Sequence, residues 1–199
     1  MALIILAHPN FDASIASKTI IEELKNSNLN LEIRDIHALY PTYKIDIKAE
    51  QEALLRHQTI VFQSPFYWLN IPAILKLYFD EVFEYQFAYG SKGDKLKGKN
   101  FILSLTTGAQ KEEYKITGKH HRTIYEFTKN IEQTAYYAQM NYIDPIYLHS
   151  MSTHGGPGQP PLSEDELKAR AKEHTKNIVS LLATLQHQKA MSKESTVND

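Results

Sequence analysis

The feature that most constrains how this chain folds is the regular alternation of short apolar segments with longer amphipathic ones. Five segments have the pattern of β-strands, and they lie at residues 3–7, 31–36, 59–64, 100–106 and 142–148. Continuous apolar runs such as 3–7 are typical of strands buried on both faces, whereas the alternation in 31–36 predicts a half-covered edge strand. Pro145 cannot donate to a ladder hydrogen bond, so the last segment requires a bulge or an edge position.

Between these strands, apolar residues recur at the spacing of amphipathic helices. Such segments begin at Ser14, Ala49, Pro72, Ile124 and residue 164. Ser163 and Glu166 form a capping box at the start of the final helix, which we expect to end near residue 187. Residues 188–199 are polar and aperiodic. The sequence therefore predicts a single domain over 1–187, followed by a disordered tail over 188–199.

Strands that alternate with helices imply a mostly parallel sheet covered on both faces. Five such strands predict an α/β fold, a three-layer doubly wound parallel sheet with strand order 2-1-3-4-5. In these sheets ligands bind beyond the carboxyl ends of the strands, at the switch point between strands 1 and 3. The loops that we expect to bind a ligand are therefore 8–14, 65–70 and 106–120.

Composition and charge exclude several classes of function. The chain carries 22 basic and 23 acidic residues, and its net charge of −1 supplies no electrostatic footprint for nucleic acid. It has no cysteine, which excludes disulfides, thiolate nucleophiles and iron–sulfur clusters. No segment approaches the roughly 20 apolar residues that cross a bilayer, so we expect a cytoplasmic protein. The histidines lack a recognised ligand spacing and no G-x-S-x-G motif occurs, so neither a metal site nor a serine hydrolase is predicted.

The first loop contains no glycine-rich phosphate motif, since neither G-x-G-x-x-G nor G-x-x-x-x-G-K-[ST] occurs. Ser14 and Ser17 stand three residues apart at the opening of a helix, where free N–H groups and the positive helix end favour an anion. With His8 nearby, these hydroxyls predict a phosphate site. A second interpretation stays open, in which Asp12 or Ser14 only caps the helix.

The two other loops carry aromatic and small residues. The run S-P-F-Y-W-L-N after the third strand offers a flat wall to a planar ring. Trp68, the only tryptophan, is the favoured ligand-facing side chain there, while Phe66 and Leu69 are open to ordinary core packing. After the fourth strand, the small residues of 106–108 let a ring edge approach the backbone.

Further along the third loop, Tyr114 and His120 are able to exchange protons with a substrate. Taken alone, His120 or His121 is more often a solvated surface residue than a catalytic one. A phosphate site, an aromatic wall and a Thr-Gly loop at one edge of a sheet nevertheless agree with one another, and together they predict a flavin site.

Several longer motifs resemble those of a known family. They are AHP at 7–9, S-x-x-S at 14–17, YPTYKIDIKAEQEAL at 40–54, SPFYWLNIPAILKLYFDEVF at 64–83, FAYG at 87–90 and TTG at 106–108. On these motifs, residues 2–185 resemble the flavodoxin-like NAD(P)H:quinone oxidoreductases. The likeness is greatest to the short bacterial branch, which includes general stress oxidoreductases and the ancillary subunits of glutathione-gated potassium efflux systems.

This resemblance implies a set of flavin-binding residues, namely His8, Ser14, Ile15, Ala16, Ser17, Pro65, Phe66, Tyr67, Trp68, Thr106, Thr107, Gly108 and Ala109. The first loop would hold the flavin phosphate, the second would line the isoalloxazine, and the third would bind its pyrimidine edge. Backbone donors at Thr107 and Gly108 would stabilise negative charge on the ring. Tyr114 and His120 fall where the family places the Tyr and His that steady charge during hydride transfer.

Two positions depart from the family pattern. Ser17 stands where the family often has Asn, and Ala109 stands where it often has a second Gly. The shorter hydroxyl weakens the expected hold on the phosphate, and the extra methyl group alters the approach to the ring.

The resemblance also implies an activity. Hydride from NAD(P)H would pass through the bound flavin to a quinone or similar acceptor in ping-pong order. We expect FMN, the cofactor of the short relatives, with FAD as the alternative. A homodimer is expected as well, with each site walled partly by the partner chain.

Two other functions stay open. The chain is also compatible with a regulatory subunit that binds and gates a membrane potassium-efflux protein. A flavodoxin-like electron carrier fits the aromatic loops, although such carriers are often strongly acidic and this chain has a net charge of only −1.

Overall fold

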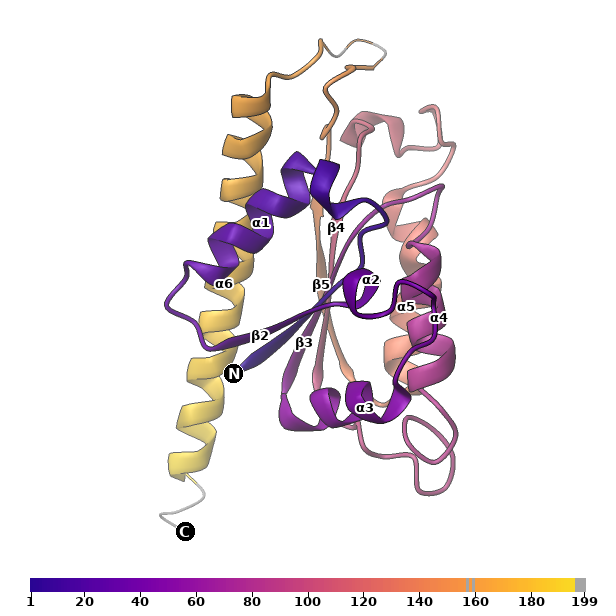
Figure 1. Cartoon of the computed structure of the whole chain (residues 1–199), viewed down its shortest axis with the longest axis vertical. Helices are drawn as coiled ribbons and strands as arrows, with labels where there is room; N and C mark the ends of the chain where they lie inside the picture. The colour runs from indigo at the N-terminus through magenta and orange to yellow at the C-terminus, as the bar shows by residue number, and fades with distance from the viewer. Residues whose placement is uncertain (157, 159, 196–199) are drawn as a thin grey trace.

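The computed structural model describes residues 1–156, 158 and 160–195, and its centre is a five-stranded parallel sheet (Figure 1). The strands are β1 (Ala2–Leu6), β2 (Leu31–Asp35), β3 (Thr59–Pro65), β4 (Asn100–Thr106) and β5 (Asn141–Leu148). They are ordered β2-β1-β3-β4-β5, and every neighbouring pair is parallel. The doubly wound topology predicted from the sequence is confirmed.

Helices cover both faces of this sheet, as Figure 1 shows. On one face α1 (Ile15–Lys25) packs against α6 (Glu164–Ser195). The other face carries α2 (Ile36–Leu39), α3 (Ile47–Arg56), α4 (Ala73–Val82) and α5 (Ile124–Tyr137). Two 3-10 turns, η1 (Phe11–Ala13) and η2 (Lys111–Glu113), lie in the loops after β1 and β4. Within the described part of the chain, no helix is both long and apolar enough to cross a membrane.

Each face of the sheet has its own apolar core, because successive side chains of a strand point to opposite faces. Phe62 and Phe101 belong to the core under α4 and α5, where their rings lie 4.5 Å apart. The adjacent residues Val61 and Ile102 belong to the core under α1 and α6. The continuous apolar runs of the sequence are therefore explained by burial on both sides.

The strand register brings the functional loops to one edge. Leu6 pairs with Gln63, Pro65 pairs with Thr106, and Thr106 pairs with Leu148. Because all the strands are parallel, the loops after β1, β3, β4 and β5 leave the sheet at the same edge. The register between β4 and β5 shifts opposite Pro145, so this strand has both the bulge and the edge position that the proline predicted.

The final helix is longer than the sequence predicted. Its first turn has the expected capping box, in which Ser163 Oγ accepts from the Glu166 N–H and the Glu166 carboxylate accepts from the Ser163 N–H. The helix then continues to Ser195, past the expected end near residue 187. Of the tail predicted over 188–199, the first eight residues are thus helical, and residues 196–199 lie outside the described residues.

A buried polar chain crosses the core between the sheet and α6. Ser104 Oγ donates to Gln63 Oε1 over 2.6 Å and lies 2.8 Å from His174 Nε2. Gln63 and Ser104 are fully buried, and His174 is 4% exposed. Burial lowers the pKa of His174 to about 4, so its ring is neutral at pH 7. These buried polar groups lie two residue pairs below Pro65 and Thr106, near the edge where the loops leave the sheet.

A second buried polar group fastens the edge strand to the helices. The fully buried carboxylate of Glu50 accepts two hydrogen bonds from Arg34, at 2.6 Å from Nη2 and 3.0 Å from Nε. The Tyr40 hydroxyl donates to the same carboxylate over 2.6 Å. Burial and the neighbouring Glu50 raise the pKa of Tyr40 to about 12, which keeps its hydroxyl a donor. Strand β2 is thereby tied to α3.

Candidate functional site

A hollow of about 320 Å3 lies at the carboxyl edge of the sheet, and we call it the edge hollow. Its lining comes from the loops after β1, β3, β4 and β5 and from the first residues of α1 and α6. The lining residues are His8, Ala13, Ser14, Ile15, Ala16, Pro65, Phe66, Thr106, Thr107, Gly108, Met151, Ser152, Thr153, His154 and Leu167. The switch point between β1 and β3 is therefore the place where three predicted loops meet.

The start of helix α1 supplies hydrogen-bond donors to the edge hollow. Ser14 is the N-cap, and its Oγ accepts the N–H of Ser17 over 3.1 Å. The hydroxyl proton of Ser14 stays available, as do the N–H groups of Ile15 and Ala16, which have no partner within the helix. The two interpretations of the sequence are thus compatible, because Ser14 caps the helix and can still donate to an anion.

His8 stands beside this helix start in a defined protonation state. Its Nδ1 accepts the N–H of Asn10 over 3.0 Å, so the neutral ring carries its proton on Nε2. Burial lowers the pKa of His8, with the Asp35 carboxylate opposing that shift. The imidazole therefore adds a neutral donor to the wall of the hollow.

Ser17 does not line the edge hollow, contrary to what the S-x-x-S motif predicted. Its side chain is fully buried, and within the described residues its Oγ has no hydrogen-bond partner. The position three residues after Ser14 lies under the first helical turn, where it faces the sheet core. Only its backbone N–H takes part in the loop structure, by donating to Ser14.

The second loop reaches the edge hollow with Pro65 and Phe66 only. Beyond them the chain forms a tight turn in which Tyr67 and Asn70 exchange backbone hydrogen bonds of 2.7 and 3.2 Å. The two central residues, Trp68 and Leu69, have φ angles of 50° and 64°. The Trp68 side chain is 93% exposed and that of Tyr67 is 60% exposed. The structure thus places the predicted aromatic wall outside the hollow, except for Phe66.

The third loop forms the floor at Thr106, Thr107 and Gly108. The Thr107 N–H donates to Leu148 O over 2.8 Å, so it is not a free donor, and that part of the prediction is wrong. The Gly108 N–H has no such partner among the described residues, and a Cβ at Gly108 would meet only Ser152, at 3.9 Å. Ala109 is not part of the lining, and its carbonyl accepts from Thr107 Oγ1 over 2.9 Å.

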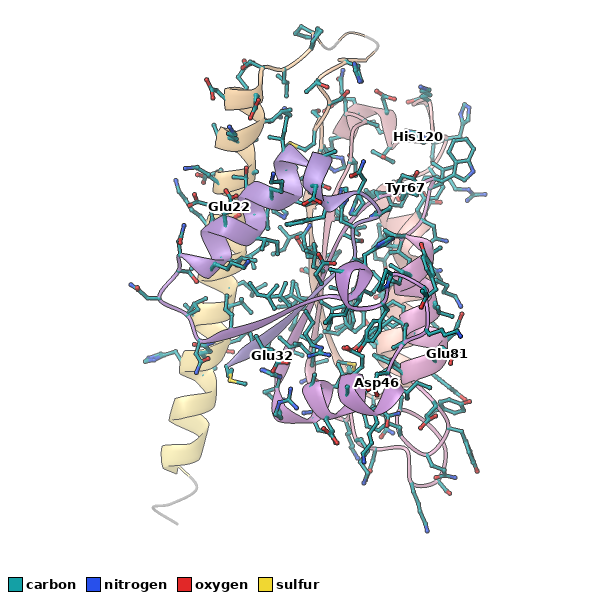
Figure 2. The ribbon with its side chains drawn as sticks, viewed as in Figure 1. Glu22, Glu32, Asp46, Tyr67, Glu81 and His120 are labelled. Atoms are coloured by element: carbon teal, nitrogen blue, oxygen red, sulfur yellow. The ribbon has the colours of Figure 1, made fainter. Side chains whose placement is uncertain are left out.

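Tyr114 and His120 lie next to the floor rather than in the lining. Their rings stack at a centroid distance of 4.5 Å and an angle of 19°. The Tyr114 ring also contacts Phe66 at 5.8 Å, and His120 Nε2 lies 3.8 Å from the Glu113 carboxylate. Burial raises the pKa of Tyr114, opposed by a hydrogen bond with Thr107, so the phenol is protonated at neutral pH. Figure 2 shows His120 and Tyr67 at the same rim of the molecule.

The segment after β5 was not predicted to line the site. Met151, Ser152, Thr153 and His154 all contribute to the edge hollow, and His149 Nδ1 lies 3.2 Å from Thr107 Oγ1. A signal was available in the sequence: a loop that follows the strand next to β4 also leaves the sheet at its carboxyl edge. The edge hollow therefore combines donors for an anion at one end with a peptide floor and Phe66 at the other, which suits a phosphorylated planar ligand.

Known proteins are similar to this chain in sequence and fold. A family model described as a flavodoxin-like fold matches residues 1–175. An uncharacterized NAD(P)H oxidoreductase of Bacillus subtilis (strain 168), YrkL, is 35% identical over 170 residues, which cover 85% of this chain and 92% of that relative.

Solved structures agree with these sequence matches. General stress protein 14 from Treponema denticola, solved in complex with FMN, superposes with a TM-score of 0.80 and is 32% identical, over 90% of this chain and 98% of that one. An NADPH-quinone reductase from P.pentosaceus shares the fold at a TM-score of 0.70 and 24% identity, over 88% of this chain and 97% of that one. The chain belongs to the flavodoxin-like fold family.

Proposed function

We propose that this protein is an FMN-dependent NAD(P)H oxidoreductase that reduces a quinone or a similar acceptor. One observation carries the proposal: the donors at the start of α1 and the floor at 106–108 line the same hollow. Two relatives above 30% identity support it, because one is named an NAD(P)H oxidoreductase and the other was solved with FMN. The quinone acceptor is the finer part of the proposal, and it comes from the resemblance and from the name of the P.pentosaceus structure.

The residues of the edge hollow fit FMN. Ser14, the Ile15 and Ala16 N–H groups and His8 Nε2 would hold the phosphate, since a helix start with free N–H groups favours an anion. The ring would lie on Thr106–Gly108, where Gly108 leaves room for close approach. When bound, FMN supplies hydride transfer between NAD(P)H and the acceptor, and the protein supplies orientation and electrostatics.

FMN suits this chain better than FAD because of an adjoining hollow. That second hollow, also about 320 Å3, shares residues 13–15 with the edge hollow and so adjoins the helix start that would hold the first phosphate. Its charged side chains are Asp12, Glu22, Glu164, Lys18 and Lys168. Three carboxylates against two ammonium groups disfavour another anion there.

The remaining polar residues would act on charge and protons at the floor. The Gly108 N–H is placed to donate to negative charge on a bound ring, while the Thr107 N–H is not. Tyr114, protonated at neutral pH, would donate to a substrate oxygen, with His120 stacked against it and Glu113 nearby. These two residues stay proposed in the roles that the resemblance implies.

Ser14→Asp tests the phosphate site. Asp is a good N-cap, so helix α1 and the fold should persist. A carboxylate about 4 Å from the phosphate costs about 4 kcal/mol at an effective dielectric constant near 20, so FMN affinity should fall on the order of a thousandfold. The measurement is FMN binding by absorbance and dialysis, together with quinone-dependent NADPH oxidation.

The control for this variant is Ser180→Asp, which adds the same charge on an exposed position of α6 away from the edge hollow. It should keep FMN and activity. Retention of FMN by Ser14→Asp at wild-type affinity would contradict the assignment of the phosphate site. A wild-type protein that binds no flavin at all would contradict the proposed function.

The proposal includes a homodimer, as the resemblance implies. A groove of about 400 Å3 lies between α4 and α5, and its apolar side chains include Phe79, Phe83, Tyr89 and Tyr137. The Tyr137 side chain is 66% exposed. Sedimentation velocity at micromolar concentration should show a dimer, and Tyr137→Glu should shift it toward monomer. A wild-type monomer would contradict this part of the proposal.

A further inference from the structure

His149, the first residue after β5, contacts the floor of the edge hollow from outside its lining. Its Nδ1 lies 3.2 Å from Thr107 Oγ1 and within hydrogen-bonding reach of the Ala109 carbonyl. Its ring packs against those of Tyr114 and Tyr147, at centroid distances of 5.4 and 6.1 Å. The imidazole therefore stands between the end of β5 and the phenol that would donate to the substrate.

The backbone holds His149 and Thr107 on adjacent segments. The Ser150 N–H donates to Ala109 O over 3.0 Å. The Met151 N–H donates to Thr107 O over 2.8 Å. These bonds continue the pairing of β4 and β5 beyond the ends of the strands, so the two side chains face each other from fixed positions.

The Ala109 carbonyl is offered more donors than it can accept. A carbonyl oxygen has two lone pairs, and the Ser150 N–H occupies one of them. The Thr107 hydroxyl, 2.9 Å away, and His149 Nδ1 both reach the other. Because a carbonyl only accepts, His149 binds it with a proton on Nδ1. Burial lowers the pKa of His149, so the ring is neutral at pH 7 and its Nε2 carries no proton.

The Thr107 hydroxyl has a second acceptor within reach, the oxygen of Tyr114. A hydrogen bond from Thr107 lowers the pKa of Tyr114, against the larger opposite effect of burial. A hydrogen bond lowers the pKa of a phenol when it stabilises the charged phenolate. Thr107 and Tyr114 are only 2% and 6% exposed, so a phenolate formed there has little water to stabilise it.

We propose that His149, Thr107 and Ala109 form a hydrogen-bond switch that stabilises the Tyr114 phenolate, which makes His149 a positioning residue of the reductase. The inference rests on the proposed function for the reaction that Tyr114 serves. Before proton transfer, the Thr107 hydroxyl donates to Ala109 O and His149 Nδ1–H donates to Thr107 Oγ1. After it, the Thr107 hydroxyl turns to the Tyr114 oxygen and His149 Nδ1–H takes its place on Ala109 O. Every donor keeps an acceptor in both arrangements.

The switch accompanies the transfer of one proton. A quinone that accepts a hydride becomes a hydroquinone monoanion, which needs one proton to become neutral. The O–H bond of Tyr114 breaks, the proton moves to the substrate oxygen, and the electron pair stays on Tyr114. Water then returns a proton to the phenolate, and the Thr107 hydroxyl turns back. His149 keeps its own proton throughout, so it acts by its position.

Other ionisable groups also face this cluster. They come from the loop after β4 and from β5, and they are Lys111, Glu112, Glu113, His120 and Tyr147. The loop after β3 and helix α5 add only apolar rings, those of Phe66 and Phe127. All of these groups are kept in the variants of His149 described next, so their effects cancel in each comparison.

The first test measures the acidity of the Tyr114 phenol and needs no turnover. Protein labelled with 3-fluorotyrosine gives one 19F resonance that is missing from Tyr114→Phe, and its chemical shift is followed against pH. The acidity should fall about tenfold in His149→Phe, because a hydrogen bond to a charged oxygen is worth about that factor. His149→Asn should restore most of it, since the amide donates from the place of Nδ1. Unchanged acidity in His149→Phe would overturn the proposal.

A kinetic double-mutant cycle supplies the second test. With menadione as acceptor, His149→Phe should lower kcat about tenfold and leave KM for NADPH within about twofold. In the Tyr114→Phe background the same substitution should change kcat by less than about twofold, because no phenolate forms there. The matched control is His187→Phe, which makes the same change at an exposed position near the end of α6. A tenfold loss in both backgrounds would show a packing role and overturn the switch.

The two proposals fail in different ways. If the protein reduces menadione but His149→Phe alters neither phenol acidity nor kcat, the switch is wrong and the proposed function stands. If phenol acidity responds as expected but the protein oxidises neither NADH nor NADPH, the switch stands and the proposed function is wrong.

Discussion

Protonation of His174 should set the acid limit of this fold. The ring is 4% exposed, lies 2.8 Å from Ser104 Oγ, and stands on the helix that covers one face of the sheet. Burial lowers its pKa from 6.5 to about 4, so the folded protein binds this proton more weakly than the unfolded chain does. Its contribution to stability is therefore complete above pH 6.5, decreases as the pH falls below that value, and is lost below pH 4.

The size of the effect follows from the same two values. A pKa lowered from 6.5 to about 4 corresponds to roughly 3 kcal/mol, at about 1.4 kcal/mol per tenfold change in proton affinity. At pH 5 about 2 kcal/mol of this should already be lost. Because a domain is stable by only about 5–15 kcal/mol, this is a measurable fraction.

The assay is urea unfolding of the wild type and of His174→Gln at pH 7.5, 6 and 5. Glutamine keeps an amide donor near Ser104 but does not titrate, so its free energy of unfolding should fall by about 2 kcal/mol less than that of the wild type between pH 7.5 and 5. Other histidines with lowered pKa values, such as His8 and His149, are present in both proteins and cancel. Parallel pH profiles for the two proteins would refute the reasoning.

Two further predictions concern the edge strand β2 and the loop after β4 that carries Gly118 and His120. Glu50→Gln should destabilise the fold by about 3 kcal/mol in urea unfolding, because it leaves the Arg34 guanidinium without its buried carboxylate. Arg34→Met combined with Glu50→Leu should recover most of that loss, and unchanged stability of Glu50→Gln would count against the ion pair. Gly118→Ala should lower quinone-reductase kcat/KM at least about tenfold with little change in Tm. The new Cβ would come within 2.5 Å of Glu113 O and displace His120, so wild-type kinetics in this variant would show that the loop does not position the histidine.

The sequence predicted the fold well because the determining signals are local. Pro145 predicted a bulge or an edge position, and its strand has both. The capping box of Ser163 and Glu166 predicted the start of the last helix. The apolar run at 3–7 identified a buried strand because burial on both faces leaves no polar alternation. The helix that extends to Ser195 was missed because its last turns lack an apolar face to predict them.

The site was predicted less completely because its details depend on contacts between distant segments. The Thr107 N–H is occupied because the register of β4 and β5 sets it beside Leu148. Trp68 lies outside the hollow because the turn that carries it has positive φ angles at residues 68 and 69. The sequence did not predict this turn, because it has no Gly at those positions. The segment after β5 lines the hollow through tertiary packing, and only the strand order indicates this, because its own composition does not.

The direction of helix α6 has a practical consequence for attaching this protein to a surface. It begins beside the edge hollow, where Leu167 is part of the lining, and runs the length of the sheet to Ser195 at the opposite end of the molecule (Figure 1). Strand β1 likewise starts at the amino edge, far from the loops. An affinity tag or electrode linker placed after α6 would leave the mouth of the hollow facing solution.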